Sequence, residues 1–420
     1  MQIANKTIDA IAKAIGFLRR QPRDWKVTVV RSSTAMFFYQ LIFPYLSVYT
    51  IALGATATQL GIVNSAGMVI AGLVGPFIGW LIDRTGVKRI YLTGISLLAI
   101  SYLTYGLAQS WAIIIIALAA YWLGNAGTGH SCSVICGNSL SNEDRATGMS
   151  LCETFASGLL GIAAPMLGAL LVATYGGVNV SGIRPLFFLC LAGTGVTFLL
   201  ILTQLSNRRW EGPGNAGLNF FKGVREVFKQ ERNLKRWLVI TSVGFLPMGM
   251  LLPFTQPFAH EVKGVNQYVL GAMVTGFALT PLLFGIPAGR LADRIGRKRV
   301  LYLTIPLVWI SSLILIWAPS PGFLVLAGIL QGFYFVSAMV AGAMTFELVP
   351  PEQMGRWLGV LRFCRLLLAA GGAYLAGTIW DNVGPQYVFL TVMGLDLFIR
   401  IPLLIGMPET LGLLKSPKGE

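Results

Sequence analysis

The chain has 420 residues, of which 55% are hydrophobic and only 12% are charged. Soluble domains carry about a quarter charged residues, so this chain lacks the polar side chains to cover a globular core of its size. Its apolar runs, such as residues 92–108 and 187–203, have the length and continuity of membrane-spanning helices. The composition therefore excludes a soluble protein, and the continuous runs exclude a transmembrane β-barrel, whose strands alternate over about ten residues.

The formal net charge of +15 is distributed unevenly. Of the 32 Lys and Arg residues, 26 lie in segments on one side of the predicted membrane spans, four lie within spans, and only Arg184 and Lys263 fall on the other side. Basic loops stay in the cytoplasm, so the pattern predicts a multi-pass inner-membrane protein with both termini cytoplasmic. The charge serves orientation and contact with anionic lipid, and a nucleic-acid partner is not expected.

Twelve transmembrane helices are predicted from the apolar runs, six in each half of the chain. Most connections are short, which forces neighbouring helices to run antiparallel. The predicted fold class is an all-α membrane protein with two six-helix bundles. The predicted helices cover residues 27–51, 57–82, 88–108, 111–135, 147–173 and 184–205 in the first half, and 237–259, 266–291, 298–318, 322–348, 354–380 and 385–407 in the second.

These helices divide the chain into five segments. Residues 1–26 are basic with apolar residues at helical spacing, which predicts an amphipathic helix on the cytoplasmic membrane surface. Residues 27–205 form the N-terminal bundle and residues 237–407 the C-terminal bundle. The linker 206–236 opens with a glycine-rich stretch and continues as a second amphipathic surface helix. Residues 408–420 are a cytoplasmic tail.

The two halves share a repeated motif. Residues 79–89 read GWLIDRTGVKR and residues 289–299 read GRLADRIGRKR, so seven of eleven positions agree. A repeat at the half-chain distance predicts two related bundles. Within the motif, Asp83 and Asp293 lie at helix C-termini, where the helix dipole disfavours a carboxylate. An Arg of the same loop or the positive N-terminus of a neighbouring helix can supply the partner that each needs.

The doubled motif, the chain length and the half-chain repeat together resemble the major facilitator superfamily of transporters. In the first copy, Val87 replaces a basic residue. The resemblance implies two bundles around a shared substrate site, with the motif loops as cytoplasmic latches in which Asp83 faces the start of helix 11 and Asp293 the start of helix 5. Two of the motif glycines allow close helix approach (79 and 289) and two allow left-handed turns (86 and 296). The latch residues are Gly79, Asp83, Arg84, Gly86, Gly289, Asp293, Arg294 and Gly296.

Two further stretches bear on the type of transport. Residues 164–169, APMLGA, resemble an exporter motif of this family with alanine twice in place of glycine, whereas Ala120 stands where proton-coupled members often carry Arg. The leading interpretation is a secondary transporter that moves a small organic solute across the inner membrane by proton-coupled efflux. An uptake symporter or an organic-anion exchanger is the alternative.

Other functional classes lack the residues that they need. The sequence contains no nucleophile–base pair, metal-ligand set or phosphate loop, so it predicts no enzyme, cofactor or metal. His130 points away from Cys132 at helical spacing, which argues against a metal site there. The expected energy source is a proton gradient. The expected partners are a small-molecule substrate and the lipid bilayer, and the family expectation is a monomer.

Ionisable residues within predicted spans are functional candidates because their burial in the membrane is costly. Arg31, His130 and Glu153 fall at similar depth in the cytoplasmic third and form a predicted coupling or gating cluster. The alternative is a buried Arg31–Glu153 ion pair with a spectator histidine. On helix 12, Asp396 and Arg400 are four residues apart and are expected to pair with each other for structural reasons.

The resemblance also implies where substrate binds, because helices 1, 4, 7 and 10 line the cavity in this family. Aromatic and Met surfaces there suit amphipathic or aromatic ligands. Arg362 on helix 11 either attracts an anionic substrate or extends its charged end toward water at the inner surface. The candidate substrate-binding residues are Tyr39, Gln40, Phe43, Asn125, Met248, Gln331, Tyr334 and Arg362.

Overall fold

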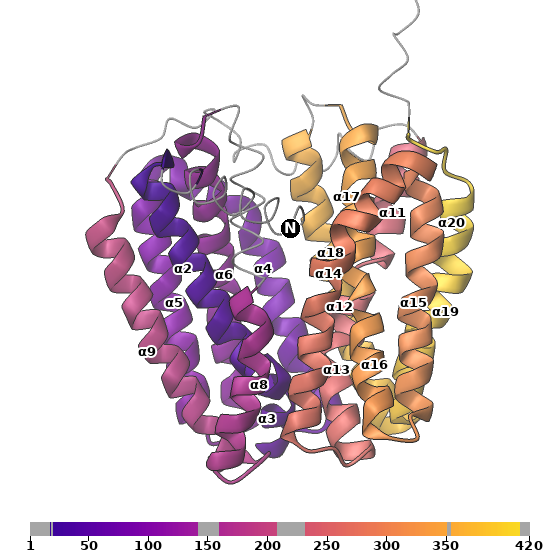
Figure 1. Ribbon diagram of the computed structural model, residues 1–420, viewed down its shortest axis with the longest axis horizontal. Coiled ribbons are helices and arrows are strands. Elements are labelled where there is room, and N and C mark those ends of the chain that lie inside the picture. Colours follow the sequence, from indigo (N-terminus) through magenta and orange to yellow (C-terminus); the bar gives the residue numbers. More distant parts are fainter. Residues whose placement is uncertain (1–16, 18–19, 142–158, 208–231, 351–353, 412–420) are drawn as a thin grey trace, which may run out of the picture.

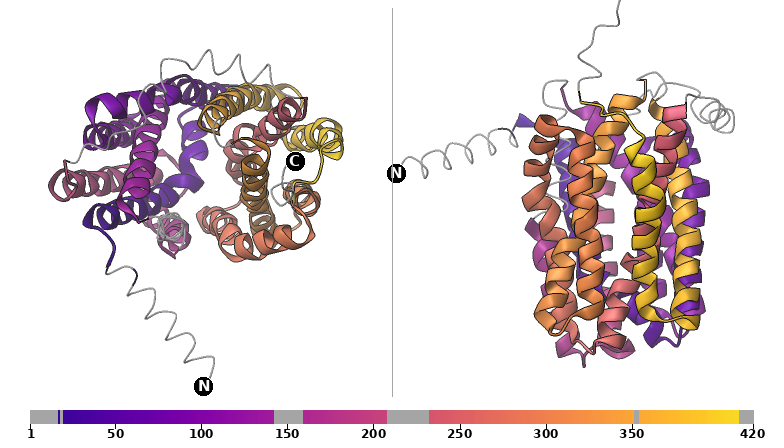
Figure 2. Two further views of the ribbon diagram at one scale, coloured as in Figure 1. Left: turned by 90° about the horizontal axis from the view of Figure 1, so that it is seen from above. Right: turned by 90° about the vertical axis from the view of Figure 1, so that its right-hand side faces the viewer.

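The structure of the protein is a computed structural model, which describes residues 17, 20–141, 159–207, 232–350 and 354–411. In these ranges two bundles of long helices stand side by side, one from each half of the chain (Figures 1 and 2). Eleven helical stretches are long and apolar enough to span a membrane, and a shorter apolar helix covers residues 161–174. The prediction of an all-α membrane protein is therefore confirmed.

In the first bundle the described helices match the predicted ones to within a few residues at each end. Helix 5 begins within the undescribed residues 142–158, and most of the two predicted surface segments, 1–26 and 206–236, also lies outside the described residues. The elements are α2 (Arg23–Ile42), η1 (Phe43–Tyr45), α3 (Leu46–Ala52), α4 (Ala57–Thr85), α5 (Val87–Leu107), α6 (Trp111–Ser139), α8 (Leu159–Thr174) and α9 (Val180–Gln204).

The second bundle follows the same order, with more interruptions. Its elements are α11 (Arg232–Val243), α12 (Leu246–Met250), α13 (Leu252–Pro257), η2 (Phe258–Val262), α14 (Gln267–Ile295), α15 (Arg297–Trp317), α16 (Pro321–Gln331), α17 (Phe333–Leu348), α18 (Met354–Asn382), α19 (Pro385–Leu395), η4 (Asp396–Arg400) and α20 (Ile401–Ile405).

Predicted helices 1, 7, 10 and 12 are not regular along their whole length. Helix 1 changes to a 3-10 turn at Pro44, and helix 7 is interrupted next to Pro247 and Pro253. Proline lacks the N–H that an α-helix needs in its interior, which explains these interruptions. Helix 10 is interrupted at Gly332, and helix 12 contains a π-helical turn, Asp396–Arg400.

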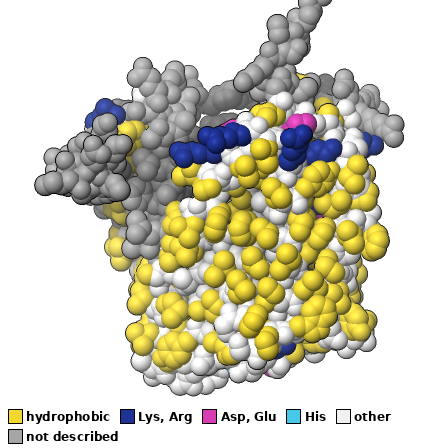
Figure 3. Space-filling model, turned by 45° about the vertical axis from the view of Figure 1, so that its right-hand side comes forward, with side chains coloured by type: hydrophobic (Ala, Val, Ile, Leu, Met, Phe, Trp, Pro, Cys, Tyr) yellow, Lys and Arg dark blue, Asp and Glu magenta, His cyan; other side chains and the backbone are white. Residues whose placement is uncertain are grey.

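Basic side chains mark one end of the molecule. In Figure 3, Lys and Arg side chains gather in a band at one end, while hydrophobic side chains cover the wall below. Exposed Arg89, Arg294 and Arg299 lie at this end, close to the junctions α4–α5 and α14–α15. We call it the basic end, and the end that carries the α3–α4 and α18–α19 connections the opposite end.

The two bundles pack tightly against each other toward the opposite end. A Cβ atom on Gly61 of α4 would lie 2.4 Å from the carbonyl oxygen of Ala373 on α18, and one on Gly377 of α18 would lie 2.3 Å from the carbonyl oxygen of Ala57. Only glycine fits at such distances, so the backbones of these helices are in direct contact. We call this contact the α4–α18 seam. The hydroxyl of Ser65 also donates a hydrogen bond across it to the carbonyl of Ala370.

A second contact between the bundles joins α8 and α14. A Cβ atom on Gly271 would lie 2.8 Å from the carbonyl oxygen of Pro165, and Thr275 Oγ1 donates to the carbonyl of Ile162 at 3.2 Å. Farther along α14, toward the basic end, residues 282–284 and 286 are exposed, and a Cβ atom on Gly289 would have no neighbour within 4 Å among the described residues. The described parts of the bundles therefore diverge at this end, and the start of helix 5, toward which Gly289 lies in the predicted arrangement, is outside the described residues, so the close approach at Gly289 stays a prediction.

Within the first bundle, α5 and α6 cross through paired glycines. A Cβ atom on Gly124 would lie 2.6 Å from the carbonyl oxygen of Gly94, and one on Gly94 would lie 2.9 Å from that of Gly124. On the same helix α6, a Cβ atom on Gly129 would have no neighbour within 4 Å among the residues that the structure describes. Two glycines on one helix thus differ in whether they are required for packing.

Replacement of Gly124 by alanine is predicted to destabilise the protein, because the added methyl group forces the two helices apart. We expect Gly124→Ala to cost about 1–3 kcal/mol, as overpacked interiors do. Gly129→Ala should be neutral or slightly stabilising, since alanine favours a helix over glycine. Thermal unfolding of the two purified variants in detergent measures the difference, and equal melting temperatures would show that the crossing is less tight than described.

Candidate functional site

A continuous series of aromatic rings connects the two bundles. Tyr121 of α6 stacks on Tyr39 of α2 with ring centroids 5.5 Å apart, and Tyr39 lies 5.3 Å from Phe43. Phe43 stacks on Phe277 of α14 at 6.4 Å, and Phe277 lies 5.3 Å from Phe335 of α17. We call these five residues the aromatic ladder. It crosses from the first bundle to the second between Phe43 and Phe277, so movement of one bundle against the other changes it.

The interruption of helix 1 falls within this ladder. Tyr39 and Phe43 are four residues apart and share a helix face. The helix changes to its 3-10 turn at Phe43 because Pro44 follows. Of the ladder residues, the sequence predicted Tyr39 and Phe43 as substrate-binding candidates, and their ring partners were missed.

Arginine side chains lie inside both bundles. Arg31 of α2 is buried, with its guanidinium 5.1 Å from the centre of the Tyr91 ring. Arg365 of α18 lies 6.0 Å from the centre of the Phe245 ring. The Nε atoms of both arginines have no hydrogen-bond partner in the part of the chain that the structure describes. Glu153, the predicted partner of Arg31, lies outside the described residues, so their pairing stays a prediction.

His130 and Arg362 lie on helices of opposite bundles, α6 and α18. His130 of α6 is half-buried, and its Nδ1 lies 2.7 Å from the carbonyl oxygen of Ala126, a geometry that calls for a proton on Nδ1. Arg362 is exposed although it also contacts the α4 backbone, with Nε 4.0 Å from the position of a Cβ atom on Gly75. It therefore lies beside α4 at the boundary between the bundles, with its side chain accessible in the described part of the chain.

The other predicted substrate-binding residues have varied surroundings. Asn125 is exposed on α6. Gln40 is buried, and its Oε1 has no hydrogen-bond partner among the described residues. Met248 packs on the cluster of buried apolar residues at the α4–α18 seam.

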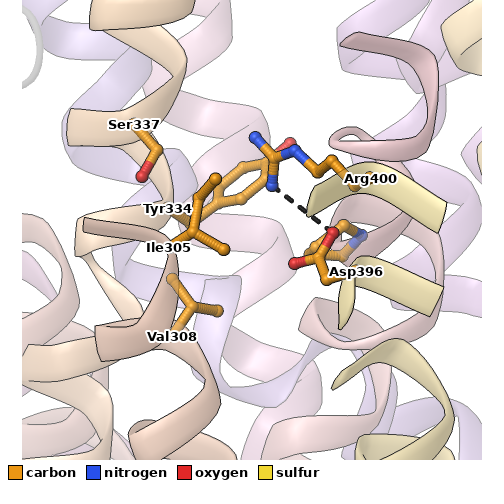
Figure 4. A pocket seen from close by; sticks show the side chains of 7 residues that line it. Ile305, Val308, Tyr334, Ser337, Asp396 and Arg400 are labelled. Carbon is orange, nitrogen blue, oxygen red and sulfur yellow. Dashed lines mark hydrogen bonds and ion pairs between the residues drawn. The ribbon is translucent and has the colours of Figure 1, made fainter. Parts of the chain in front are cut away.

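Gln331 and Tyr334 lie inside the second bundle rather than on its face toward the first. Gln331 is buried, and its Nε2 donates a 2.9 Å hydrogen bond to Thr255 of the same bundle. Tyr334 lines a small pocket with Asp396 and Arg400 (Figure 4). The expectation that both face a cavity between the bundles therefore needs correction.

The pocket beside Tyr334 contains a buried ion pair. Asp396 and Arg400 are both more than nine-tenths buried and lie 3.5 Å apart, as their spacing predicted. Trp309 of α15 donates a 3.1 Å hydrogen bond to the second carboxylate oxygen of Asp396. The pocket has a volume of about 10 Å³, room for a single water molecule. The π-helical turn turns both charges inward, while the three residues between them are exposed.

The second copy of the repeated motif forms a network within its own bundle. Arg297 donates to Glu347 at 3.1 Å and pairs with Asp293. Glu409 of the tail accepts hydrogen bonds from the backbone N–H groups of residues 297 and 298 and so caps α15. Gly296 has φ +110°, which favours glycine, and a Cβ atom there would lie 2.4 Å from the Glu409 carboxylate. Glycine is therefore needed at this position both for the turn and for the cap by Glu409.

Asp293 remains mostly exposed next to Arg297, and the start of helix 5, its predicted latch partner, lies outside the described residues. In the first copy, Gly86 has φ +89°, as expected for a turn between helices. Arg84 and Arg294 lie in the last turns of α4 and α14, where a positive charge is favourable. The environments of Gly79 and of the Asp83 side chain lie outside what the structure describes.

Comparisons with known proteins agree with this architecture. A family model described as the Major Facilitator Superfamily matches residues 32–272 and 237–418. The multidrug resistance protein MdtG of Escherichia coli (strain K12 / DH10B) is 24% identical over 401 residues, 90% of this chain and 93% of that protein. MdtG of Citrobacter koseri is 26% identical over 367 residues, 84% of this chain and 79% of that protein.

Two solved structures share the fold at low sequence identity. The nucleoside transporter NupG superposes with a TM-score of 0.74 at 15% identity, over 94% of this chain and 99% of that one. The human organic anion transporter MFSD10 (TETRAN) gives a TM-score of 0.60 at 20% identity, over 91% of this chain and the whole of that one. At this identity the likeness concerns the fold alone.

The Asp396–Arg400 pair yields a stability prediction. Arg400→Met leaves a buried carboxylate without its partner and should cost about 3–5 kcal/mol, whereas the double variant Asp396→Asn/Arg400→Met removes both charges and should recover most of that loss. Thermal unfolding of the two variants tests this, with Arg299→Met as the exposed control. A double variant as unstable as Arg400→Met would show that the arginine acts through packing rather than charge.

Proposed function

The chain belongs to the major facilitator superfamily, and we propose that it exports small amphipathic or aromatic solutes across the inner membrane in exchange for protons. Its membership makes it a membrane transporter rather than an enzyme. The direction of transport and the coupling to protons are the proposed part. Support for efflux comes from the MdtG proteins, multidrug resistance proteins that align with most of the chain.

The aromatic ladder is the observation that carries the proposal for the substrate class. Its five rings join four helices across the boundary between the bundles, where substrate is expected to bind. Rings stack on flat apolar ligands of different outline, because the interaction depends on the ring face rather than on a fixed hydrogen-bond pattern. The exposed amide of Asn125, one helical turn beyond Tyr121, adds a polar group for orientation.

The shape of the molecule supports entry from the cytoplasm. The described parts of the bundles are in contact toward the opposite end and diverge toward the basic end. The positive-inside rule assigns the basic end to the cytoplasm. In this arrangement a cytoplasmic solute reaches the boundary between the bundles beside Arg362, and export then requires closure at the basic end and opening at the other.

We propose that the cluster of Arg31, His130 and Glu153 couples transport to protons. Arg31 and His130 lie on α2 and α6 of the same bundle, and Glu153 is placed near them by the sequence. In this proposal Glu153 or His130 carries the proton, and Arg31 compensates the carboxylate when it is ionised. The cluster lies on the cytoplasmic side of the aromatic ladder.

Exchange or uptake of an organic anion is the second candidate. It is favoured by Arg31, Arg362 and Arg365, none of which has a carboxylate partner among the described residues. An anionic substrate would supply the missing negative charge. The fold is shared with MFSD10, an organic anion transporter, although at an identity that concerns the fold alone.

Transport in proteoliposomes separates these candidates. We expect a fluorescent aromatic cation such as ethidium to move against its gradient when a pH gradient is imposed, and to equilibrate when an ionophore collapses the pH gradient. Movement of an aromatic carboxylate, by exchange and independently of pH, would favour the second candidate. Glu153→Gln should abolish proton-driven transport but spare downhill exchange, and unchanged proton-driven transport by that variant would remove Glu153 from the coupling mechanism.

Tyr39 provides a test of the aromatic ladder. Tyr39→Leu removes a ring that stacks on Tyr121 and contacts Phe43, and it should raise KM for an aromatic substrate about twofold to tenfold, the range that corresponds to roughly 0.5–1.5 kcal/mol per aromatic contact. Tyr39→Phe keeps the ring and should stay near the unmodified protein. Tyr374→Leu, at an exposed tyrosine of α18, is the control. Equal KM values for Tyr39→Leu and Tyr374→Leu would exclude the ladder as the binding surface.

A further inference from the structure

Asp381 lies at the outermost point of the α4–α18 seam. It is the second-last residue of α18, where the negative end of its own helix dipole disfavours a carboxylate. Its Oδ2 accepts a 2.8 Å hydrogen bond from the backbone N–H of Thr58, and its Oδ1 a 3.3 Å bond from that of Ala57. These donors are the first two helical residues of α4, which belongs to the other bundle. The Asp381 carboxylate therefore lies at the negative end of its own helix dipole but is stabilised by the positive N-terminal end of α4.

The start of α4 needs this partner. A helix begins with N–H groups that have no acceptor within the helix. At α4, Thr56 and Gln59 satisfy each other's N–H groups in a capping box. The N–H groups of Ala57 and Thr58 remain, and Asp381 accepts from both. The cap of α4 is therefore completed by a side chain of the opposite bundle.

The seam leaves little freedom for a different arrangement. Gly377 is one helical turn before Asp381, and its missing side chain lets the carbonyl of Ala57 approach α18. Gly61 does the same from α4, one turn farther in. Because both backbones are in contact, a small tilt between the bundles separates Asp381 from its two donors.

We propose that Asp381 is a gate residue that helps to hold the opposite end closed, and that its two hydrogen bonds must break each time that end opens. This role rests on the proposed function, because only a protein that opens its two ends in turn needs such a contact. The two helices of the seam are antiparallel, and each carries an aspartate in its last turn. The family resemblance implies that Asp83, near the end of α4, faces the start of helix 11, which is α18. Asp381 is then the counterpart of Asp83 at the other end of the same helix pair.

The test measures opening of that end without a substrate. Met68 is buried within the seam, and a cysteine at this position reacts with a membrane-impermeant maleimide from outside the cell only when the opposite end is open. The experiment uses Met68→Cys in a full chain without the five native cysteines. Asp381→Asn should raise the labelling rate about fivefold, the factor that corresponds to about 1 kcal/mol.

A second variant tests the contact from the other helix. Thr58→Pro removes the N–H that donates to Asp381 and leaves the carboxylate in place, in the first helical turn, where proline is tolerated. This variant should also raise the labelling rate. When it is combined with Asp381→Asn, the rate should rise by less than the product of the two separate factors, because both changes break the same interaction. Asp381→Glu should stay closer to the unmodified protein than Asp381→Asn. Glu261→Gln removes an exposed acidic charge at the same end and should have no effect.

Unchanged labelling in Asp381→Asn and Thr58→Pro, or fully multiplicative effects in the double variant, would overturn the proposal. Thr58→Pro keeps the test decisive if Asp381→Asn is recovered poorly, since it retains every side-chain charge. Failure of the proposed function would give a different combination of transport and labelling results. An unmodified protein that moves no solute under a pH gradient contradicts export but not the gate, whereas intact transport with unchanged labelling contradicts the gate alone.

Discussion

The close backbone contact along the α4–α18 seam constrains the rest of the molecule. Gly61 and Gly377 bring the carbonyl groups of one bundle against the other, at distances that no larger residue permits. Association of helices inside a membrane gains little from the hydrophobic effect, so it depends on such close packing and on hydrogen bonds. The α8–α14 contact repeats the arrangement with Gly271. Two bundles held by narrow glycine contacts can tilt about them without disturbing their own interiors.

The length and continuity of the apolar runs were sufficient to predict the helices, because a membrane leaves the backbone few alternatives to a helix. The irregular turns were harder to predict from the sequence. Pro44, Pro247 and Pro253 are visible in the sequence, but whether a proline ends, kinks or merely bends a membrane helix depends on the neighbours that satisfy the freed carbonyl groups. The interruption at Gly332 has no proline beside it and coincides with the close approach of the Phe277 carbonyl, so its cause lies in tertiary packing. The π-helical turn Asp396–Arg400 is followed by Pro402, which lacks the N–H that would bond to the carbonyl of Phe398.

The same limit explains which site residues were placed correctly. Tyr39 and Phe43 follow from helical spacing on one helix, but their partners Phe277 and Tyr121 come from elements that only the fold brings together. Tyr334 was assigned to a cavity between the bundles because the family resemblance implies that helix 10 lines it. The helix is interrupted at Gly332, two residues earlier, and the tyrosine points into the second bundle toward Arg400 (Figure 4). Rotation of a helix about its axis is not encoded in its hydrophobicity when all of its faces are apolar.

In the proposed cycle, an antiparallel pair of helices links the two ends of the transporter. Asp381, in the last turn of α18, lies beside the start of α4, and the family resemblance implies that Asp83, in the last turn of α4, faces the start of α18. In this proposal the same physical interaction, a carboxylate on exposed N–H groups, acts at both ends. Because α4 and α18 belong to different bundles, a tilt that brings one acid to its donors draws the other acid away. Closure of one end and opening of the other are then consequences of a single rigid movement, and the chain needs no separate signal between its two gates.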